Sequence, residues 1–258
     1  MVRECAVAGM FYTDDARELS EMVDGFIAKA PQLAEPPVII VSPHAGLVYS
    51  GECAGYAYAQ LQGRGFKRVV LAGPSHYIGF EGFAFSNADV WKTPLGDIPI
   101  ARDDIEKFLE VFDGRVFEHP APHEREHSLE VQLPFLQRVL GAFELIPIVY
   151  GNADFNDLAR IYDYFIDEET IIVVSSDLSH FYTEAEANEL DSHCNLGVEN
   201  LDLHAFDLCE ACGKTGIMAA VKYAKDHELR SRVLNYMTSA KHSGDYSRVV
   251  GYASYIFY

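Results

Sequence analysis

Short apolar runs alternate with amphipathic stretches along most of the chain. The amphipathic stretches carry apolar residues at helical spacing, and this pattern predicts helices. In the first stretch, Asp15 and Glu18 are placed like a capping box at the start of the helix. Helices are expected at residues 14–30, 103–112, 155–166, 184–201 and 216–229.

The apolar runs between these stretches are short and rich in β-branched residues, which predicts buried strands. Residues 83–100 are typical of antiparallel strands inserted into this plan. The alternation of buried strands and helices predicts one α/β domain over residues 1–258, with three layers and a mostly parallel mixed sheet flanked by helices. Strands are expected at residues 38–41, 69–72, 145–149, 171–174, 232–237 and 249–257.

The composition is that of a soluble globular protein, with 258 residues of which 49% are hydrophobic. The net charge of −19 disfavours nucleic acid and anionic lipid as partners. No stretch approaches the roughly 18 apolar residues of a membrane helix, and the N-terminus lacks the pattern of a signal peptide. The five scattered cysteines favour reduced thiols, so we expect a cytoplasmic protein without a disulfide framework.

Three histidines follow predicted strands closely. His44 ends the run "VIIVSPH", His76 ends "RVVLAGPSH", and His180 ends "TIIVVSSDLSH" with Asp177 just before it. Ligands of open α/β sheets bind outside the carboxyl ends of the strands, so parallel adjacent strands would bring these side chains together. A single histidine of this kind can simply close a loop, but three at strand ends favour a site with metal-binding or acid–base chemistry.

The segment "EHSLEVQLPFL" adds His127 and Glu130, which share one face of a helix. One interpretation is structural, with Ser128 as the N-cap and the leucines pointing inward. The other is that the histidine and the glutamate bind a metal or support its ligands. The pattern alone leaves both interpretations open.

Three other motifs give weaker indications of a functional site. Cys209 and Cys212 form a C-x-x-C pair, but no second pair completes a four-thiolate zinc site. The "GKT" that follows is not a phosphate-binding loop, because the position of the required first glycine is Leu208. The "SSDLSH" segment lacks the G-x-S-x-G elbow of a hydrolase, so a catalytic triad is disfavoured.

Several motifs in one order cover nearly the whole chain: "AVAGMFY", "PHAGLVYSG", "GPSHY", "WKTPLG", "EHSLEVQLPFL", "VVSSDLSH", "ACGKTGI" and "SGDYSRVVGYAS". By these motifs the chain resembles the Memo family, which is also found as the B protein of the AmmeMemoRadiSam group. The family is similar in fold to the class III extradiol dioxygenases. This resemblance implies a central mixed sheet flanked by helices.

The resemblance also implies a metal site. Its ligands would be His44, His76 and Cys212, and the metal would be Fe(II), with copper or zinc as alternatives. His180 matches the position of the acid–base histidine of the dioxygenases, with Asp177 beside it and His127 at the rim of the pocket. A thiolate in place of the dioxygenases' carboxylate makes the site softer and admits copper.

Three functions are compatible with these residues. The first is a metal-dependent oxidoreductase related to extradiol dioxygenases that acts on a small molecule. The second is a non-catalytic adaptor that binds a peptide or sequesters a metal, as eukaryotic family members suggest. The third is hydrolytic zinc chemistry. His180 favours an enzyme, because a metal store needs no proton shuttle beside its ligands; the substrate and the oligomeric state stay open.

Overall fold

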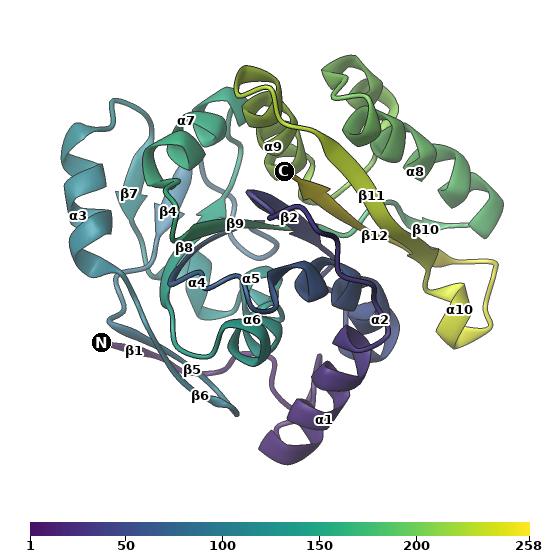
Figure 1. Cartoon of the computed structure of the whole chain (residues 1–258), viewed down its shortest axis with the longest axis horizontal. Helices are drawn as coiled ribbons and strands as arrows, with labels where there is room; N and C mark the ends of the chain where they lie inside the picture. The colour runs from purple at the N-terminus through teal and green to yellow at the C-terminus, as the bar shows by residue number, and fades with distance from the viewer.

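The centre of the computed structural model, which describes residues 1–258, is a mixed nine-stranded sheet (Figure 1). Along the sheet the strands follow the order β10 (His180–Tyr182), β12 (Val249–Phe257), β2 (Ile39–Ser42), β9 (Thr170–Ser175), β3 (Arg68–Pro74), β8 (Glu144–Tyr150), β4 (Phe83–Phe85) and β7 (Val116–Glu118). A further strand, β11 (Ser231–Thr238), pairs with β12 outside this path.

The central strands β2, β9, β3 and β8 are parallel to one another. Antiparallel pairing begins on either side of them, where β12 joins β2 and β4 joins β8. The expected α/β class with a mixed sheet flanked by helices is confirmed. The sheet is not mostly parallel, however, because β10, β11 and β12 pair antiparallel and β4 joins β8 antiparallel, while β7 pairs parallel with β4 at the edge. Most of the buried apolar side chains form one continuous core of 62 residues around these strands.

Helices cover both faces of the sheet (Figure 1). On one face, α1 (Ala16–Ile27), α2 (Leu47–Tyr58) and α6 (Leu133–Leu140) pack together. The other face carries α7 (Phe155–Phe165), α8 (Glu184–Glu199) and α9 (Lys214–Asp226). The remaining elements are α3 (Arg102–Val111), α4 (Ala121–Glu124), α5 (His127–Glu130), α10 (Ala240–Ser243), the 3-10 turns η1 (Ala59–Leu61) and η2 (Leu203–Leu208), and a small sheet of β1 (Val2–Arg3), β5 (Val90–Thr93) and β6 (Gly96–Pro99).

The predicted helices and strands are all present, with ends shifted by a few residues. Asp15 caps α1 and accepts a hydrogen bond from the backbone N–H of Glu18. The expected capping box is not completed, because the Glu18 carboxylate accepts from the Thr13 hydroxyl instead of the Asp15 N–H. The sequence pattern missed α2, because this helix is rich in glycine and alanine and has buried positions on most of its sides. Such a helix has no polar face, so the helical period that reveals an amphipathic helix is weak.

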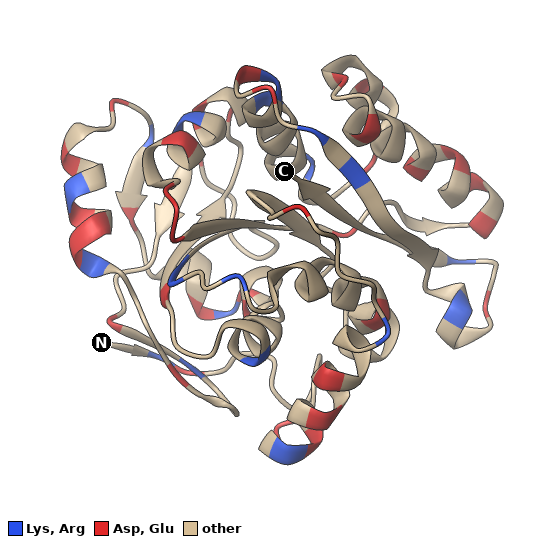
Figure 2. Cartoon of the chain, in the orientation of Figure 1, with Lys and Arg blue, Asp and Glu red and all other residues tan.

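Charged side chains lie on the outer helices, as Figure 2 shows for α1, α3 and α8, whereas the central strands carry almost none. This distribution leaves the excess of acidic groups on the surface. None of the helices combines the length and the apolar composition needed to span a lipid bilayer.

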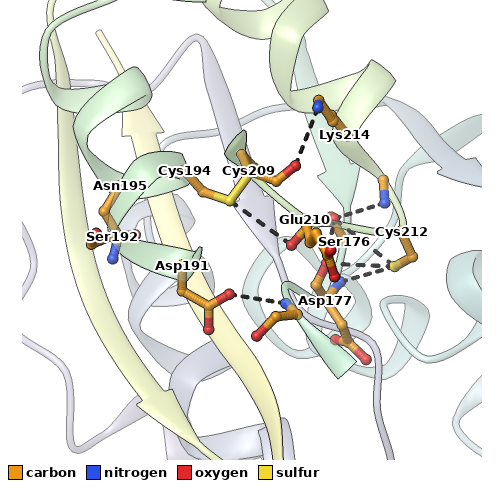
Figure 3. The surroundings of a disulfide bond; sticks show 12 residues. Ser176, Asp177, Asp191, Ser192, Cys194, Asn195, Cys209, Glu210, Cys212 and Lys214 are labelled. Carbon is orange, nitrogen blue, oxygen red and sulfur yellow. Dashed lines mark hydrogen bonds between the residues drawn. A yellow bond between two sulfur atoms is a disulfide. The ribbon is translucent and has the colours of Figure 1, made fainter. Parts of the chain in front are cut away.

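The expectation that every cysteine is reduced is wrong for Cys194 and Cys209, which form a disulfide (Figure 3). The chain reverses after α8, and η2 then packs back onto that helix. Gly197 permits this close approach, because a Cβ atom there would lie 2.5 Å from the ring of Phe206. Spacing in the sequence could not reveal this turn. By the chain-entropy model, closing a loop of about 15 residues contributes about 3 kcal/mol to stability.

The N-terminal segment is tied to the core by the buried carboxylate of Glu130. It accepts hydrogen bonds from Arg3 Nη1 (2.6 Å), the backbone N–H groups of Ala6 and Val7, and the hydroxyl of Tyr12 (2.6 Å). Arg3 and Glu130 are both almost fully buried. These four bonds offset the cost of removing the two charges from water.

Replacing Glu130 by Gln should lower the free energy of unfolding by about 3–5 kcal/mol, the usual cost of leaving one partner of a buried ion pair alone. The amide would also turn a donor toward groups that already donate. Urea denaturation measures the effect, with Glu21→Gln as the matched control, because Glu21 pairs with Arg17 on the exposed surface. A loss for Glu130→Gln no greater than that of the control would contradict the anchoring role.

Candidate metal centre

The candidate site lies at the carboxyl ends of three neighbouring strands. His44 follows β2, His76 follows β3, and Asp177 follows β9, which lies between them. Because the three strands are parallel, their ends meet at one edge of the sheet. The expected convergence is confirmed for His44 and His76, whose ring centroids lie 5.2 Å apart.

A third imidazole completes this cluster. His127, at the start of α5, has its ring centroid 5.3 Å from that of His44 and 4.5 Å from that of His76. One ligand nitrogen from each of the three histidines lies within 4.8 Å of the others. Sequence reasoning placed His127 at the rim of the pocket, and the structure brings it into the imidazole cluster itself.

The ring of His44 is held by Ser175, at the end of β9. The Ser175 hydroxyl donates to the carbonyl of Ser128 (2.5 Å) and accepts from Nε2 of Gln132 (2.8 Å). Its single proton is therefore used, so the 2.8 Å contact to His44 Nδ1 must be a bond that the imidazole donates. This assigns the proton to Nδ1 and leaves the lone pair of His44 on Nε2.

Glu126 orients His76 in the same way. Its carboxylate accepts from His76 Nδ1 (2.8 Å) and from the backbone N–H of His76 (2.6 Å). Burial raises the pKa of Glu126, but the hydrogen bonds and charge interaction with His76, together with the N–H of Ser128, lower it to about 2. The carboxyl group is thus ionised at neutral pH, and Nε2 of His76 is the nitrogen left for a ligand.

Glu126 also caps α5 by accepting from the backbone N–H of Ser128 (3.0 Å). The interpretation of Ser128 as the N-cap is therefore wrong, since the cap lies two residues earlier. The leucines of this segment, Leu129, Leu133 and Leu136, are buried as expected. The carboxylate of Glu130 points to the N-terminal segment, so it lies outside the imidazole cluster.

Cys212 lies beside His44, although 168 positions separate them in the sequence. Its Sγ is 3.3 Å from His44 Nε2 and accepts from the backbone N–H of Asp177 at 3.3 Å. Gly213 lets this loop approach β9, because a Cβ atom there would lie 2.6 Å from the carbonyl oxygen of Ser175. Burial raises the pKa of the Cys212 thiol, and the carboxylate of Asp177 raises it further.

Asp177 is a buried positioning group next to these side chains. Its Oδ1 accepts from the backbone N–H groups of His44 (2.7 Å) and Ala45 (3.3 Å), which fixes the turn after β2. Its Oδ2 lies 4.0 Å from His44 Nε2. Burial raises the pKa of the carboxyl group, although the hydrogen bond from His44 N–H acts in the opposite direction.

His180, at the start of β10, is half-buried and is not one of the three imidazoles whose ligand nitrogens lie within 4.8 Å of one another. It lines an open pocket of about 370 Å³ together with Cys209, Cys212 and Lys214. The pocket therefore shares Cys212 with the surroundings of His44. Sequence reasoning expected His180 to be an acid–base residue near the metal but outside its ligands, and this role stays a prediction.

Comparison with known sequences identifies the family of the chain. A family described as "Memo-like protein" matches residues 3–256. The chain belongs to the Memo family. Relatives named "MEMO1 family protein" include one from Methanobrevibacter smithii, 37% identical over all of both chains, and one from Aquifex aeolicus, 34% identical over 99% of both. A third, from Thermoplasma acidophilum, is 31% identical over 99% of this chain and 98% of its own.

In this Memo protein the supporting residues were harder to find than the histidines. Sequence reasoning did not single out Glu126, Ser175 or Gln132, which hold His76 and His44. The available signals were positional: Glu126 precedes His127 directly, and Ser175 is the last residue of β9. Only the fold shows which ring each of them contacts.

Burial keeps two imidazoles of the cluster neutral, those of His127 and His44. It lowers the pKa of His127 to about 4, and the nearby rings of His44 and His76 lower it further. Burial likewise holds the pKa of His44 well below its usual range. Neutral imidazoles have free lone pairs at pH 7, as metal ligands require.

The burial of His123 on α4 should make the stability of the protein depend on pH. Nε2 of His123 donates to the carbonyl of Ala84 (3.0 Å), and burial, followed by the Arg3 guanidinium, lowers its pKa to about 3. Above pH 6.5 the ring is neutral in both the folded and the unfolded chain. As the pH falls below 6.5, the unfolded chain takes up a proton that the folded protein excludes, so stability falls by up to about 1.4 kcal/mol per pH unit.

The His123→Gln variant should lack this pH-dependent loss, because the amide can donate to Ala84 without titrating. Urea denaturation at pH 8, 7, 6 and 5 compares it with the wild type. We expect a constant difference in unfolding free energy from pH 8 to 7, and then a shift in favour of the variant by about 2 kcal/mol at pH 5. A difference that stays constant down to pH 5 would mean that His123 protonates freely in the folded protein.

Proposed function

We propose that this Memo protein is a metal-dependent oxidoreductase that acts on a small molecule and is related to the extradiol dioxygenases. The observation that carries the proposal is the cluster of His44, His76 and His127, with ligand nitrogens within 4.8 Å of one another at the carboxyl edge of the sheet. An open pocket with His180 in its wall lies next to it, across Cys212. A site of this kind has room for a substrate beside a metal.

The donor set fits a first-row transition metal. Imidazole and thiolate ligands favour iron, copper or zinc, whereas magnesium and calcium require oxygen ligands. The bonds to Ser175 and Glu126 leave Nε2 of His44 and His76 for binding, as in other histidine metal sites. We take Fe(II) as the first candidate, with copper or zinc as alternatives, and the bound ion would supply Lewis-acid and electron-transfer chemistry.

The candidate ligands were identified in two ways. His44, His76 and Cys212 are the ligands implied by the family resemblance, and His127 joins them through its distances to both imidazoles. The thiol proton of Cys212 faces two acceptors, His44 Nε2 at 3.3 Å and the carbonyl of Asp177 at 3.5 Å. Because this proton must leave before the sulfur can bind a metal, binding should weaken as the pH falls.

His180 would move the proton of the reaction. It lies in the pocket wall, where a bound substrate can reach its ring directly or through one water molecule. Asp177 would keep the backbone of His44 in place, since both of its hydrogen bonds to that turn run from backbone N–H groups. Neither residue is needed to hold the metal.

The ligand set can be tested with His127→Ala and Cys212→Ser, compared with the exposed His204→Ala as control. We expect His127→Ala to weaken binding of Fe(II), Zn(II) and Cu(I) alike, because a nitrogen donor is lost. Cys212→Ser should weaken Cu(I) binding most, because the hydroxyl is a poor ligand for soft ions. Competition titrations measure both effects. Equal, small losses for every ion in Cys212→Ser would make Cys212 a bystander.

The enzymatic role can be tested with His180→Ala. Metal content should stay near that of the wild type, while oxygen uptake with substrate should fall by a factor of about 100 to 10,000, the usual contribution of a positioned acid or base. Both quantities are measured on the same preparation, with His204→Ala as the control. If metal content and uptake fall in proportion, His180 is a ligand or a scaffold. If metal removal leaves partner binding intact and no uptake is found in the wild type, the protein is an adaptor.

A further inference from the structure

The disulfide and Cys212 belong to the same short loop. Cys194 lies in α8, Cys209 follows η2 directly, and Cys212 comes three residues later, just before α9 (Figure 3). The disulfide therefore links α8 covalently to the start of the loop that carries the thiol beside His44.

The end of this loop is held by hydrogen bonds. The backbone N–H of Cys212 donates to the carbonyl of Asp177 (3.2 Å), and the N–H of Gly213 donates to Ser176 Oγ (2.9 Å). The thiol itself exchanges two further bonds with the Asp177 backbone, at 3.3 and 3.5 Å. Once the sulfur binds a metal as a thiolate, it can no longer donate to Asp177, so part of this anchorage is lost.

The start of the loop is joined to α8 by the disulfide and by the packing of η2, where the Phe206 ring lies against Gly197. Its other contacts are the N–H of Cys209 donating to the carbonyl of Phe206 (3.1 Å), Lys214 Nζ donating to the carbonyl of Cys209 (3.1 Å), and a bond from Tyr182 to the exposed Glu210 (2.9 Å). The first two are local to the loop and its flanks. The disulfide is thus the covalent link between the start of the loop and α8, beside the packing of η2.

The disulfide also borders the candidate site. Cys209 lines the same pocket of about 370 Å³ as Cys212 and His180. Cys209 is 3% exposed and Cys194 is fully buried, so Cys209 is the half of the disulfide that a small reductant in this pocket meets.

We propose that the Cys194–Cys209 disulfide is a redox-controlled clamp that positions Cys212 for metal binding. This inference rests on the proposed metal site. A dithiol reductant would supply two electrons and two protons: the S–S bond breaks, Cys194 and Cys209 become thiols, and the reductant becomes a disulfide. Without the link, the loop gains freedom and Cys212 is held less firmly beside His44, so the metal is bound more weakly.

The first measurement is a thiol count on the unfolded protein. Protein purified without reductant should show three reactive thiols, from Cys5, Cys53 and Cys212, and all five cysteines should react after reduction. Five reactive thiols before reduction would overturn the proposal, because the clamp would be absent.

The second measurement is a Co(II) titration of oxidised protein and of protein reduced with a phosphine that is then removed by desalting under inert gas. Reduction should weaken Co(II) binding about 10- to 100-fold, the usual effect of losing outer support for a metal ligand. It should also lower the sulfur-to-cobalt charge-transfer absorption at saturating Co(II). Circular dichroism checks that the reduced protein stays folded.

Variants separate the clamp from a general effect of reduction. The Cys194→Ala/Cys209→Ala protein should bind Co(II) like the reduced wild type and should not respond to the phosphine. Cys212→Ser should bind weakly and equally in both redox states, since the clamp would have no thiol to position. Cys53→Ser, which changes a buried free cysteine, should respond like the wild type.

The outcomes distinguish the clamp from the metal site itself. If oxidised wild-type protein does not bind Co(II), the proposed metal site fails. If oxidised and reduced proteins bind it equally, with the same charge-transfer band, the site stands and the clamp is refuted. A redox response that persists in Cys212→Ser would also refute the clamp, because the disulfide would then act without Cys212.

Discussion

The parallel pairing of β2, β9 and β3 is the constraint on which the candidate site depends. Each strand pairs with its neighbour residue by residue up to its last residues, so that Ser42 lies opposite Ser175 and Ala72 opposite Val174. The loops that follow therefore leave the sheet at the same edge, beginning from residues that lie side by side in neighbouring strands. Were β9 antiparallel to its neighbours, Asp177 and the hydroxyl of Ser175 would lie away from His44. The hydrogen bonds that orient this imidazole would then be impossible.

The short helices α4 and α5 lie across this edge, and their position depends on the N-terminal segment. Arg3 donates from Nε to the carbonyl of His123 and from Nη2 to the carbonyl of Glu126, and it pairs with Glu130 through Nη1. One guanidinium thus holds α4 and α5 in place, and with them the carboxylate that orients His76. The buried ion pair stabilises little by itself, because two charges must leave water. Its contribution is geometric, since it sets the position of the segment that supplies Glu126 and His127.

The parts of the site that could be predicted from the sequence are those that follow from the strands. His44 and His76 come directly after apolar runs, so a parallel sheet is sufficient to bring them together. The position of His127 depends on how the segment between β7 and α6 folds over the sheet edge, which no periodic pattern encodes. Cys212 was identified through the family resemblance, because its approach to His44 depends on a loop that spacing does not describe. The disulfide could not be predicted either, because it depends on the chain reversal after α8, which spacing in the sequence does not describe.

We propose that His44, His76 and His127 bind one metal ion, with Cys212 at its side. X-ray absorption spectroscopy of the oxidised protein loaded with one equivalent of Fe(II) or Zn(II) tests this claim most directly. The account predicts imidazole scattering from about three nitrogen ligands near 2.0–2.1 Å and one sulfur near 2.3 Å for zinc. The imidazole contribution should fall by about one third in His127→Ala, and the sulfur shell should vanish in Cys212→Ser. A shell of oxygen ligands without imidazole scattering, unchanged in both variants, would contradict the account.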